Sequence, residues 1–85
     1  MHQQLKSLNA LYKHIKHNKE AYIQDLSVLR PVDNRWEVAL SLSTDSKKPE
    51  VFTIATDRKN AELAHKQLLS MQLQGINIAK LYRTT

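Results

Sequence analysis

Two histidines and a glutamate follow one another at intervals of three residues, as His14, His17 and Glu20. Imidazole nitrogens and a carboxylate are ligands that a divalent metal ion accepts, so this spacing raises the question of a metal site. On a helix, such positions spread over about 120° of the surface, and only two of the three side chains reach one ion easily. Further ligands would have to come from His2 or His65, and the sequence contains no HExxH motif. We therefore predict no metal-binding residues and no cofactor, and we interpret the segment as the solvated side of a helix.

The same segment is basic, which suggests a second chemistry, contact with phosphate. Residues 1–19 carry four lysines and no acid, residues 20–57 carry four basic and seven acidic residues, and residues 58–85 carry five basic residues and one acid. The net charge of +5 is thus concentrated at both ends of the sequence, as in proteins that bind polyanions, but charge of this kind also serves solubility. If the two helices predicted below lie side by side, seven side chains are candidate phosphate contacts: Lys6, Lys13, Lys16, His17, Arg58, Lys59 and Lys66.

The sequence lacks the usual catalytic patterns. It contains no glycine-rich phosphate loop, no nucleophile motif and no carboxylate pair with obvious acid–base spacing. The absence of cysteine excludes disulfides, thiolate nucleophiles and cysteine-based metal centres. A domain of 85 residues also offers little concave volume for a substrate. We therefore predict that the protein is not an enzyme, with no catalytic residues and no evident small-molecule substrate.

Length and composition indicate a single domain over residues 1–85. The hydrophobic content of 41% is enough for a folded core, and 25% charged residues is average for a globular protein. No apolar run approaches the length of a membrane span, and the first ten residues contain no continuous apolar stretch of the kind found in signal peptides. We expect a soluble, cytoplasmic protein without membrane contact, and the absence of cysteine fits that compartment.

The apolar residues of the first third recur at helical spacing. They form one stripe that runs through Leu5, Leu8, Tyr12, Ile15, Tyr22, Ile23, Leu26 and Leu29. A strand over 22–29 fits less well, because neither alternate set of side chains is cleanly apolar. We predict a helix over roughly 3–29 that ends before Pro31. A break at 17–19 remains open, since Asn18 can end one helix or cap the next.

Two strands, a second helix and a third strand are predicted to follow. Residues 35–43 alternate strictly between apolar and polar side chains, and 51–56 form the returning strand of a hairpin. The second helix, capped near residue 57, ends at Gly75, the only glycine, in the left-handed conformation of a helix end. A last strand is predicted over 76–83. The order α-β-β-α-β describes an α+β fold, a small two-layer sandwich with a three-stranded mixed sheet and helices on one face.

The alternation also predicts the character of each sheet face. Trp36 should be buried against a helix on the inner face. The outer face should carry small and polar side chains without an aromatic residue. Stacking of single-stranded bases on this sheet, as in RRM-like folds, is therefore not expected.

An alternative interpretation takes residues 22–30 as a strand, which changes the order to α-β-β-β-α. That order is loosely similar to a double-stranded RNA-binding domain, and TDRKNAELAHKQLL resembles the basic, alanine-rich final helix of that family through Arg58, Lys59 and Ala61. The resemblance covers only this segment. The glycine-rich turns of the family and the histidine of its first hairpin are missing, since RPVDNR contains neither residue type.

Apolar residues outside the predicted core suggest a protein partner. Leu69 and Leu73 lie on a flank of the second helix, turned away from its core stripe, and Leu63 lies on neither side. The sheet also has two edges that need cover. We therefore predict a small non-catalytic interaction module that self-associates, as a homodimer, or binds another protein through these three leucines. The alternative is a basic nucleic-acid-binding domain that contacts duplex phosphates through its two helices.

Overall fold

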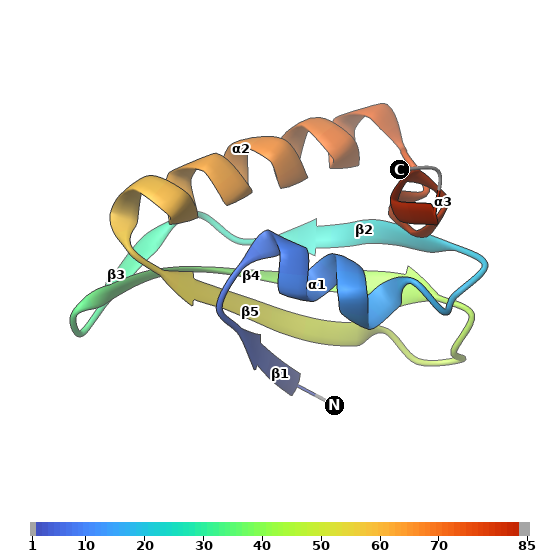
Figure 1. Cartoon of the computed structure of the whole chain (residues 1–85), viewed down its shortest axis with the longest axis horizontal. Helices are drawn as coiled ribbons and strands as arrows, with labels where there is room; N and C mark the ends of the chain where they lie inside the picture. The colour runs from blue at the N-terminus through green and yellow to red at the C-terminus, as the bar shows by residue number, and fades with distance from the viewer. Residues whose placement is uncertain (1, 84–85) are drawn as a thin grey trace.

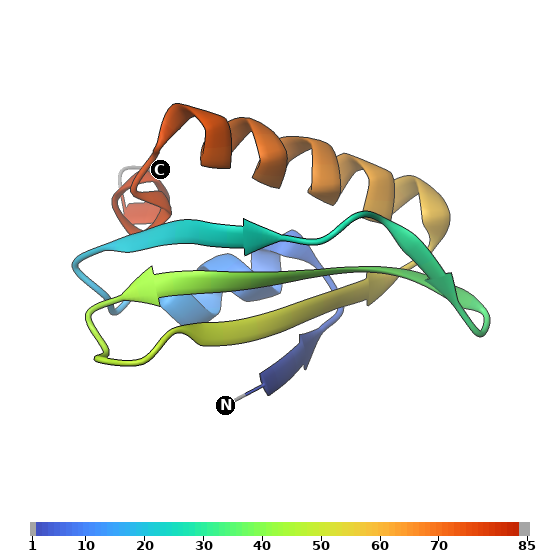
Figure 2. The same ribbon diagram turned by 180° about the vertical axis from the view of Figure 1, so that it is seen from behind.

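The chain folds as a mixed β-sheet covered on one face by helices (Figures 1 and 2). The computed structural model describes residues 2–83, with side chains for residues 3–81. In chain order the elements are β1 (His2–Leu5), α1 (Leu8–Ile15), β2 (Ala21–Leu26), β3 (Arg30–Val32), β4 (Arg35–Thr44), β5 (Glu50–Thr56), α2 (Arg58–Gln74) and α3 (Ile78–Arg83). The predicted α+β class is confirmed. The predicted three-stranded sheet and the order α-β-β-α-β are wrong, because the described residues form five strands and three helices.

Strand β4 lies at the centre of the sheet. It pairs antiparallel with β5 on one side, and on the other side with β2 along its second half and with β3 along its first. Strand β1 pairs parallel with β5 and forms one edge of the sheet, and β2 forms the other edge. Across the strands Ile54 stands between Val38 and Leu5, so three apolar side chains share one row of the inner face.

The hydrophobic core lies between the inner face of the sheet and the helices. It contains buried side chains from all three helices and from three strands: Leu11, Ile15, Ala21, Val38, Leu40, Leu42, Phe52, Ile54, Leu68, Met71, Ile78 and Ala79. Burial of a large apolar side chain stabilises a fold by about 1.5–3 kcal/mol. The small side chains of Ala61 and Ala64 are also buried, which lets the first half of α2 lie close to the sheet.

The first helix is much shorter than predicted. Residues 2–5 form β1, and α1 begins after Ser7, whose hydroxyl accepts a hydrogen bond from the backbone N–H of Ala10 at 3.1 Å. The helix ends at Ile15, and the backbone N–H of Asn18 bonds to its carbonyl. The chain therefore leaves the helix in the region where a break was left open.

Residues 19–29 contain strand β2 rather than helix, and the prediction there is wrong. Ala21 and Ile23 pair with Thr44 and Leu42 on the inner face, after which the register shifts at a bulge between Ile23 and Asp25. A bulge adds one residue to a strand and lets the side chains beyond it change face. Leu26 therefore also faces the core, although it lies three residues after Ile23.

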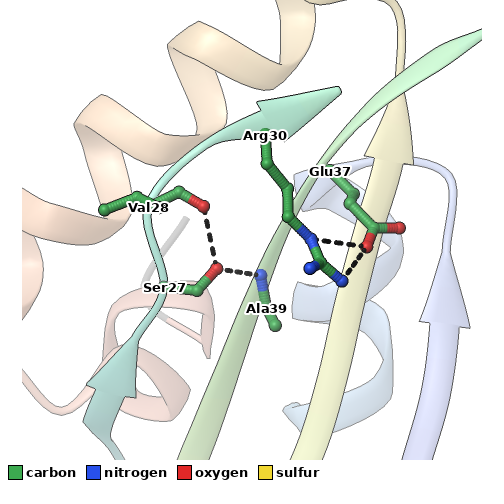
Figure 3. Close-up of polar contacts among 5 residues, drawn as sticks. All are labelled: Ser27, Val28, Arg30, Glu37 and Ala39. Carbon is green, nitrogen blue, oxygen red and sulfur yellow. Dashed lines mark hydrogen bonds and ion pairs between the residues drawn. The ribbon is translucent and has the colours of Figure 1, made fainter. Parts of the chain in front are cut away.

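The junction between β2 and β3 is held by Ser27 (Figure 3). Its backbone N–H donates to the carbonyl of Ala39 at 2.8 Å, and its hydroxyl accepts from the N–H of Ala39 at 2.8 Å and donates to the carbonyl of Val28 at 3.0 Å. The serine side chain thus takes the place of a backbone partner where the two strands part, and β2 and β3 can share one side of β4.

The last predicted strand is instead the short helix α3. The side chain of Asn77 binds the backbone at the start of this helix. Its side-chain oxygen accepts from the backbone N–H groups of Ala21, Ala79 and Lys80 at 2.9, 3.2 and 3.4 Å. Its side-chain nitrogen donates to the carbonyl of Lys19 at 3.1 Å. One asparagine therefore caps α3 and fixes it to the start of β2, and no strand forms over 76–83.

The end of α2 follows the prediction. Gly75 has φ 65° and ψ 34°, and the N–H groups of Gly75 and Ile76 bond to the carbonyls of Gln72 and Met71 at 3.1 Å. Trp36 lies on the inner face opposite Thr56, as predicted, and Arg58 of α2 lies over its ring, but the side chain is only partly buried.

Candidate functional site

The three residues of the candidate metal site lie in different surroundings. The ring of His14 in α1 meets the buried ring of Phe52 edge-on, with 5.5 Å between the centroids. His17 is exposed beyond the end of α1, and Glu20 precedes β2, where its backbone N–H donates to Asp45. Among the residues whose side chains are described, no group of three His, Asp or Glu is placed to hold a metal ion.

The predicted phosphate contacts lie on and beside the two long helices. Lys13 belongs to α1, with Lys6 and Lys16 just outside its two ends, and Lys59 and Lys66 belong to α2. All five lysines are exposed. Because α1 and α2 cover the same face of the sheet, these side chains belong to one layer of the molecule (Figure 1). The surface is called the basic face below, and it comprises Lys6, Lys13, Lys16, His17, Arg58, Lys59 and Lys66.

Arg58 differs from the lysines because its guanidinium is held in place. The guanidinium carbon lies 4.8 Å from the ring centroid of Trp36, and Nε donates to the carboxylate of Glu62 at 3.0 Å. An arginine stacked on an aromatic ring is ordered before a ligand arrives. Glu62 offsets part of its charge, so the lysines carry most of the positive excess of the basic face.

Charge divides between the two layers of the fold. Six basic residues and one acidic residue lie in the helices: Lys13, Arg58, Lys59, Lys66, Lys80, Arg83 and Glu62. Two basic and three acidic residues lie in the strands: Arg30, Arg35, Asp25, Glu37 and Glu50. The excess of five positive charges in the helices therefore equals the net charge of the whole chain, and the strands are slightly acidic.

The outer face of the sheet carries the ion pair between Arg30 and Glu37. Nε and Nη2 of Arg30 both bond to Oε1 of Glu37, at 3.2 and 2.9 Å (Figure 3). The hydroxyl of Ser41 donates to Asp25 at 3.3 Å. The Arg30–Glu37 pair therefore balances two charges of this face, and Ser41 orders the Asp25 carboxylate without neutralising it.

The outer face carries an aromatic residue, Tyr22, that was predicted to lie in a helix. Tyr22 pairs with Ser43, whose neighbours Leu42 and Thr44 are buried on the inner face, so Tyr22 points outward. Its side chain is exposed. The prediction of an outer face without aromatic residues is wrong, because it placed Tyr22 in a helix.

A hollow of about 230 Å³ lies between the start of α1 and the first half of α2. Its apolar lining comes from both helices and from β5: Leu8, Tyr12, Ile54, Leu63 and Ala64. Its polar lining consists of Lys6, Ser7, Asn9, Thr56, Asn60 and Gln67. No sequence motif marks this site, because its lining combines residues that are far apart in the chain.

The three leucines of the predicted partner interface do not form one patch. Leu63 is about half exposed and lines the hollow between α1 and α2. Leu69 and Leu73 follow one another on a different side of α2, and 39% and 78% of their respective surfaces are exposed. The adjacent Gln72 donates to the carbonyl of Gln24 in the edge strand β2 at 3.1 Å. Leu69 and Leu73 therefore lie on the β2 side of the helix, apart from Leu63.

Two titratable groups near the helix starts have shifted pKa values. Burial raises the pKa of Tyr12, whose hydroxyl donates to the sulfur of Met71 at 3.8 Å. The hydrogen bond from the Asn60 side chain is the main cause that lowers the pKa of Asp57, and bonds from Thr56 and the Asn60 backbone act in the same direction. Asp57 caps α2 as a carboxylate. The arrangement as a whole offers cations and amide donors, which are groups suited to binding anions.

Comparisons of the chain with protein-family models, with curated proteins and with solved structures give no match. Within the described residues, no helix combines the length and the apolar character needed to cross a membrane.

Proposed function

We propose that the protein is a small non-catalytic binding module that contacts the phosphates of duplex nucleic acid through its basic face. One observation carries this proposal: the helices hold an excess of positive charge equal to the net charge of the chain. A duplex is the polyanion best matched to such a surface, because its phosphates repeat along two strands and require only cations at suitable separations. Lys13 in α1, Lys16 just after its end and Lys59 in α2 are the principal contacts.

The test is a salt titration of a fluorescently labelled blunt DNA duplex with the whole chain, read by anisotropy. Binding should be insensitive to base sequence and should weaken steeply with salt, with a log–log slope of about 0.9 per phosphate contact. No binding at low salt with micromolar protein would contradict the proposal.

A second candidate function is self-association through Leu69 and Leu73. The observation that favours it is the exposure of these two adjacent leucines on the β2 side of α2. Full burial of an exposed leucine gains roughly 1.5–3 kcal/mol, so Leu73 would gain most of this amount and Leu69, which is already more than half buried, would gain less. A two-fold contact uses the same patch twice. The bulge in β2 and the bond from Gln72 to Gln24 obstruct pairing of this edge with another strand, so the contact would run through side chains.

Light scattering after gel filtration tests the second candidate. The double variant Leu69→Ser with Leu73→Ser should be a folded monomer if the parent is a dimer. The matched control is Val28→Ser, which changes an exposed apolar side chain outside the helix and should leave the oligomeric state unchanged. A parent that is monomeric at all concentrations, or a double variant that unfolds, would remove the basis for this contact.

A further inference from the structure

The hollow between α1 and α2 combines an apolar floor with polar lining side chains. Its floor is apolar, since Ile54 is fully buried and Ala64 is nearly so. Its walls include the half-buried ring of Tyr12 and the exposed side chain of Leu63. The hydroxyl of Tyr12 donates to Met71, which holds the ring in position.

Amide side chains surround this apolar floor. Asn9 lies on the α1 side, and Asn60 and Gln67 lie on the α2 side. Each amide carries both donors and an acceptor, and Asn60 also bonds to Asp57 at 2.7 Å through its nitrogen. A ligand in the hollow would therefore meet apolar contacts on its faces and hydrogen-bonding groups at its edges.

The size and surroundings of the hollow restrict its occupant. At about 230 Å³ it is smaller than the roughly 300–1,000 Å³ of sites for drug-sized ligands, so the occupant is about one ring system in size. Lys6 lines the hollow, and Lys13 and Lys59 lie on the two helices that form it. A planar group with polar edges that is attached to a phosphate satisfies all of these features.

We propose that this hollow binds a single nucleobase that has left its stack, with an adjoining phosphate held by Lys6. The proposal rests on the proposed function and extends it from phosphate contacts to one base. The base packs against Tyr12 and Leu63, as bases pack on aromatic and apolar side chains in other complexes, while the amides bond to its edges. This site lies on the helical layer, so it does not require aromatic residues on the sheet.

The experiment compares adenosine 5′-monophosphate with ribose 5-phosphate, which keeps the sugar and phosphate but lacks the base. Each is titrated into the ¹⁵N-labelled whole chain, and the backbone resonances of Asn9, Leu63 and Ala64 are followed. The nucleotide should shift these resonances and bind at least about fivefold more tightly, because stacking of one base on an aromatic side chain gives a factor of this size or larger. Equal binding of the two compounds, or no shift at these residues, would overturn the proposal.

The variant Gln67→Phe fills the hollow, and Ser70→Phe, on an exposed position of the same helix outside the hollow, is its control. Gln67→Phe should abolish the nucleotide-induced shifts and Ser70→Phe should preserve them. Retained binding in Gln67→Phe would contradict the site. If Gln67→Phe does not fold, the comparison of the two phosphates on the parent chain decides the question. The duplex titration separates the two proposals, since duplex binding without nucleotide binding removes only the base site, and the reverse result removes only the duplex function.

Discussion

The two faces of the sheet each carry an ion pair but differ in their balance of charge. On the helical side, basic residues outnumber acidic ones six to one within the helices, and the lysines of the basic face are exposed. On the outer side, Arg30 is paired with Glu37, and Asp25 accepts from Ser41. Like charges on one surface repel one another and destabilise the compact state. A bound anion relieves this repulsion on the helical side, where positive charge is in excess. The excess of positive charge is the reason that we propose the helical layer as the binding surface.

Removal of a core side chain should show the largest difference between the two faces. Phe52 is buried on the helical side of β5, and its neighbour Val51 points to the outer face with 37% of its surface exposed. Phe52→Ala should lower the free energy of unfolding by about 3–5 kcal/mol, because it leaves a cavity, whereas Val51→Ala should cost less than about 1 kcal/mol. Urea denaturation followed by circular dichroism measures both. Equal losses would mean that the outer face is also part of the packed core.

The next largest effect is expected at the junction between β2 and β3, which Ser27 holds to β4. Ser27→Ala removes the acceptor for the N–H of Ala39, so we expect a loss of about 1–3 kcal/mol in the free energy of unfolding. Ser43→Ala, a serine of the outer face outside this junction, is the control and should change stability by less than about 0.5 kcal/mol. A Ser27→Ala variant as stable as the control would show that the serine bridge contributes nothing to the sheet.

A smaller effect is expected at the C-terminal end of α2. Gly75→Ala should cost about 1 kcal/mol, because an added Cβ is unfavourable at φ 65°. No heavy atom lies within 4 Å of that Cβ, so the backbone conformation alone causes the loss. Gly75→Asn should recover part of it, since asparagine tolerates this conformation better. Thermal unfolding of the two variants checks the order, and an alanine variant as stable as the parent would contradict it.

The smallest effect is the pH dependence contributed by the cap of α2. The pKa of Asp57 is lowered in the folded chain, so its contribution to stability is fully present above the unfolded value of about 3.9 and is lost as the pH falls through the folded value. Asp57→Asn keeps a capping side chain that does not titrate. The stability of the parent relative to this variant should therefore decrease on acidification below about pH 4. Parallel curves for the two proteins in denaturation at a series of pH values would contradict the shift.

Part of the fold could be predicted because its signals are local. The alternation of residues 35–43 defines β4, and the single glycine marks the end of α2. Strand β2 was missed because its inward residues Ile23 and Leu26 are separated by a bulge, which produces a spacing of three that also suits a helix. The signal for α3 was obscured for a different reason, since one side chain, Asn77, makes its decisive bonds to residues more than fifty positions away.

The candidate site, like the fold, could be predicted only where its signals are local. The exposure of Lys13 and Lys66 follows from their positions opposite or beside the core stripes of their helices. The hollow was not predictable, because Leu8, Ile54 and Leu63 meet only after α1 and α2 have packed on β5. Strand β1 was missed for a related reason, as its four residues pair with a strand about fifty positions later. Contacts that join distant segments leave little trace in local patterns.

We expect the position of the positive charge, and not its amount, to determine binding of the duplex. Duplex anisotropy at a series of salt concentrations tests it most directly with two variants of equal net charge. Lys13→Glu with Lys59→Glu reverses two charges on the basic face, and Lys47→Glu with Lys48→Glu reverses two exposed charges in the loop between β4 and β5. The first should weaken duplex binding by more than about tenfold at low salt and reduce the salt slope by about 1.8, and the second should bind within a few-fold of the parent. Equal weakening in the two variants would show that only net charge matters and would overturn the proposed role of the basic face.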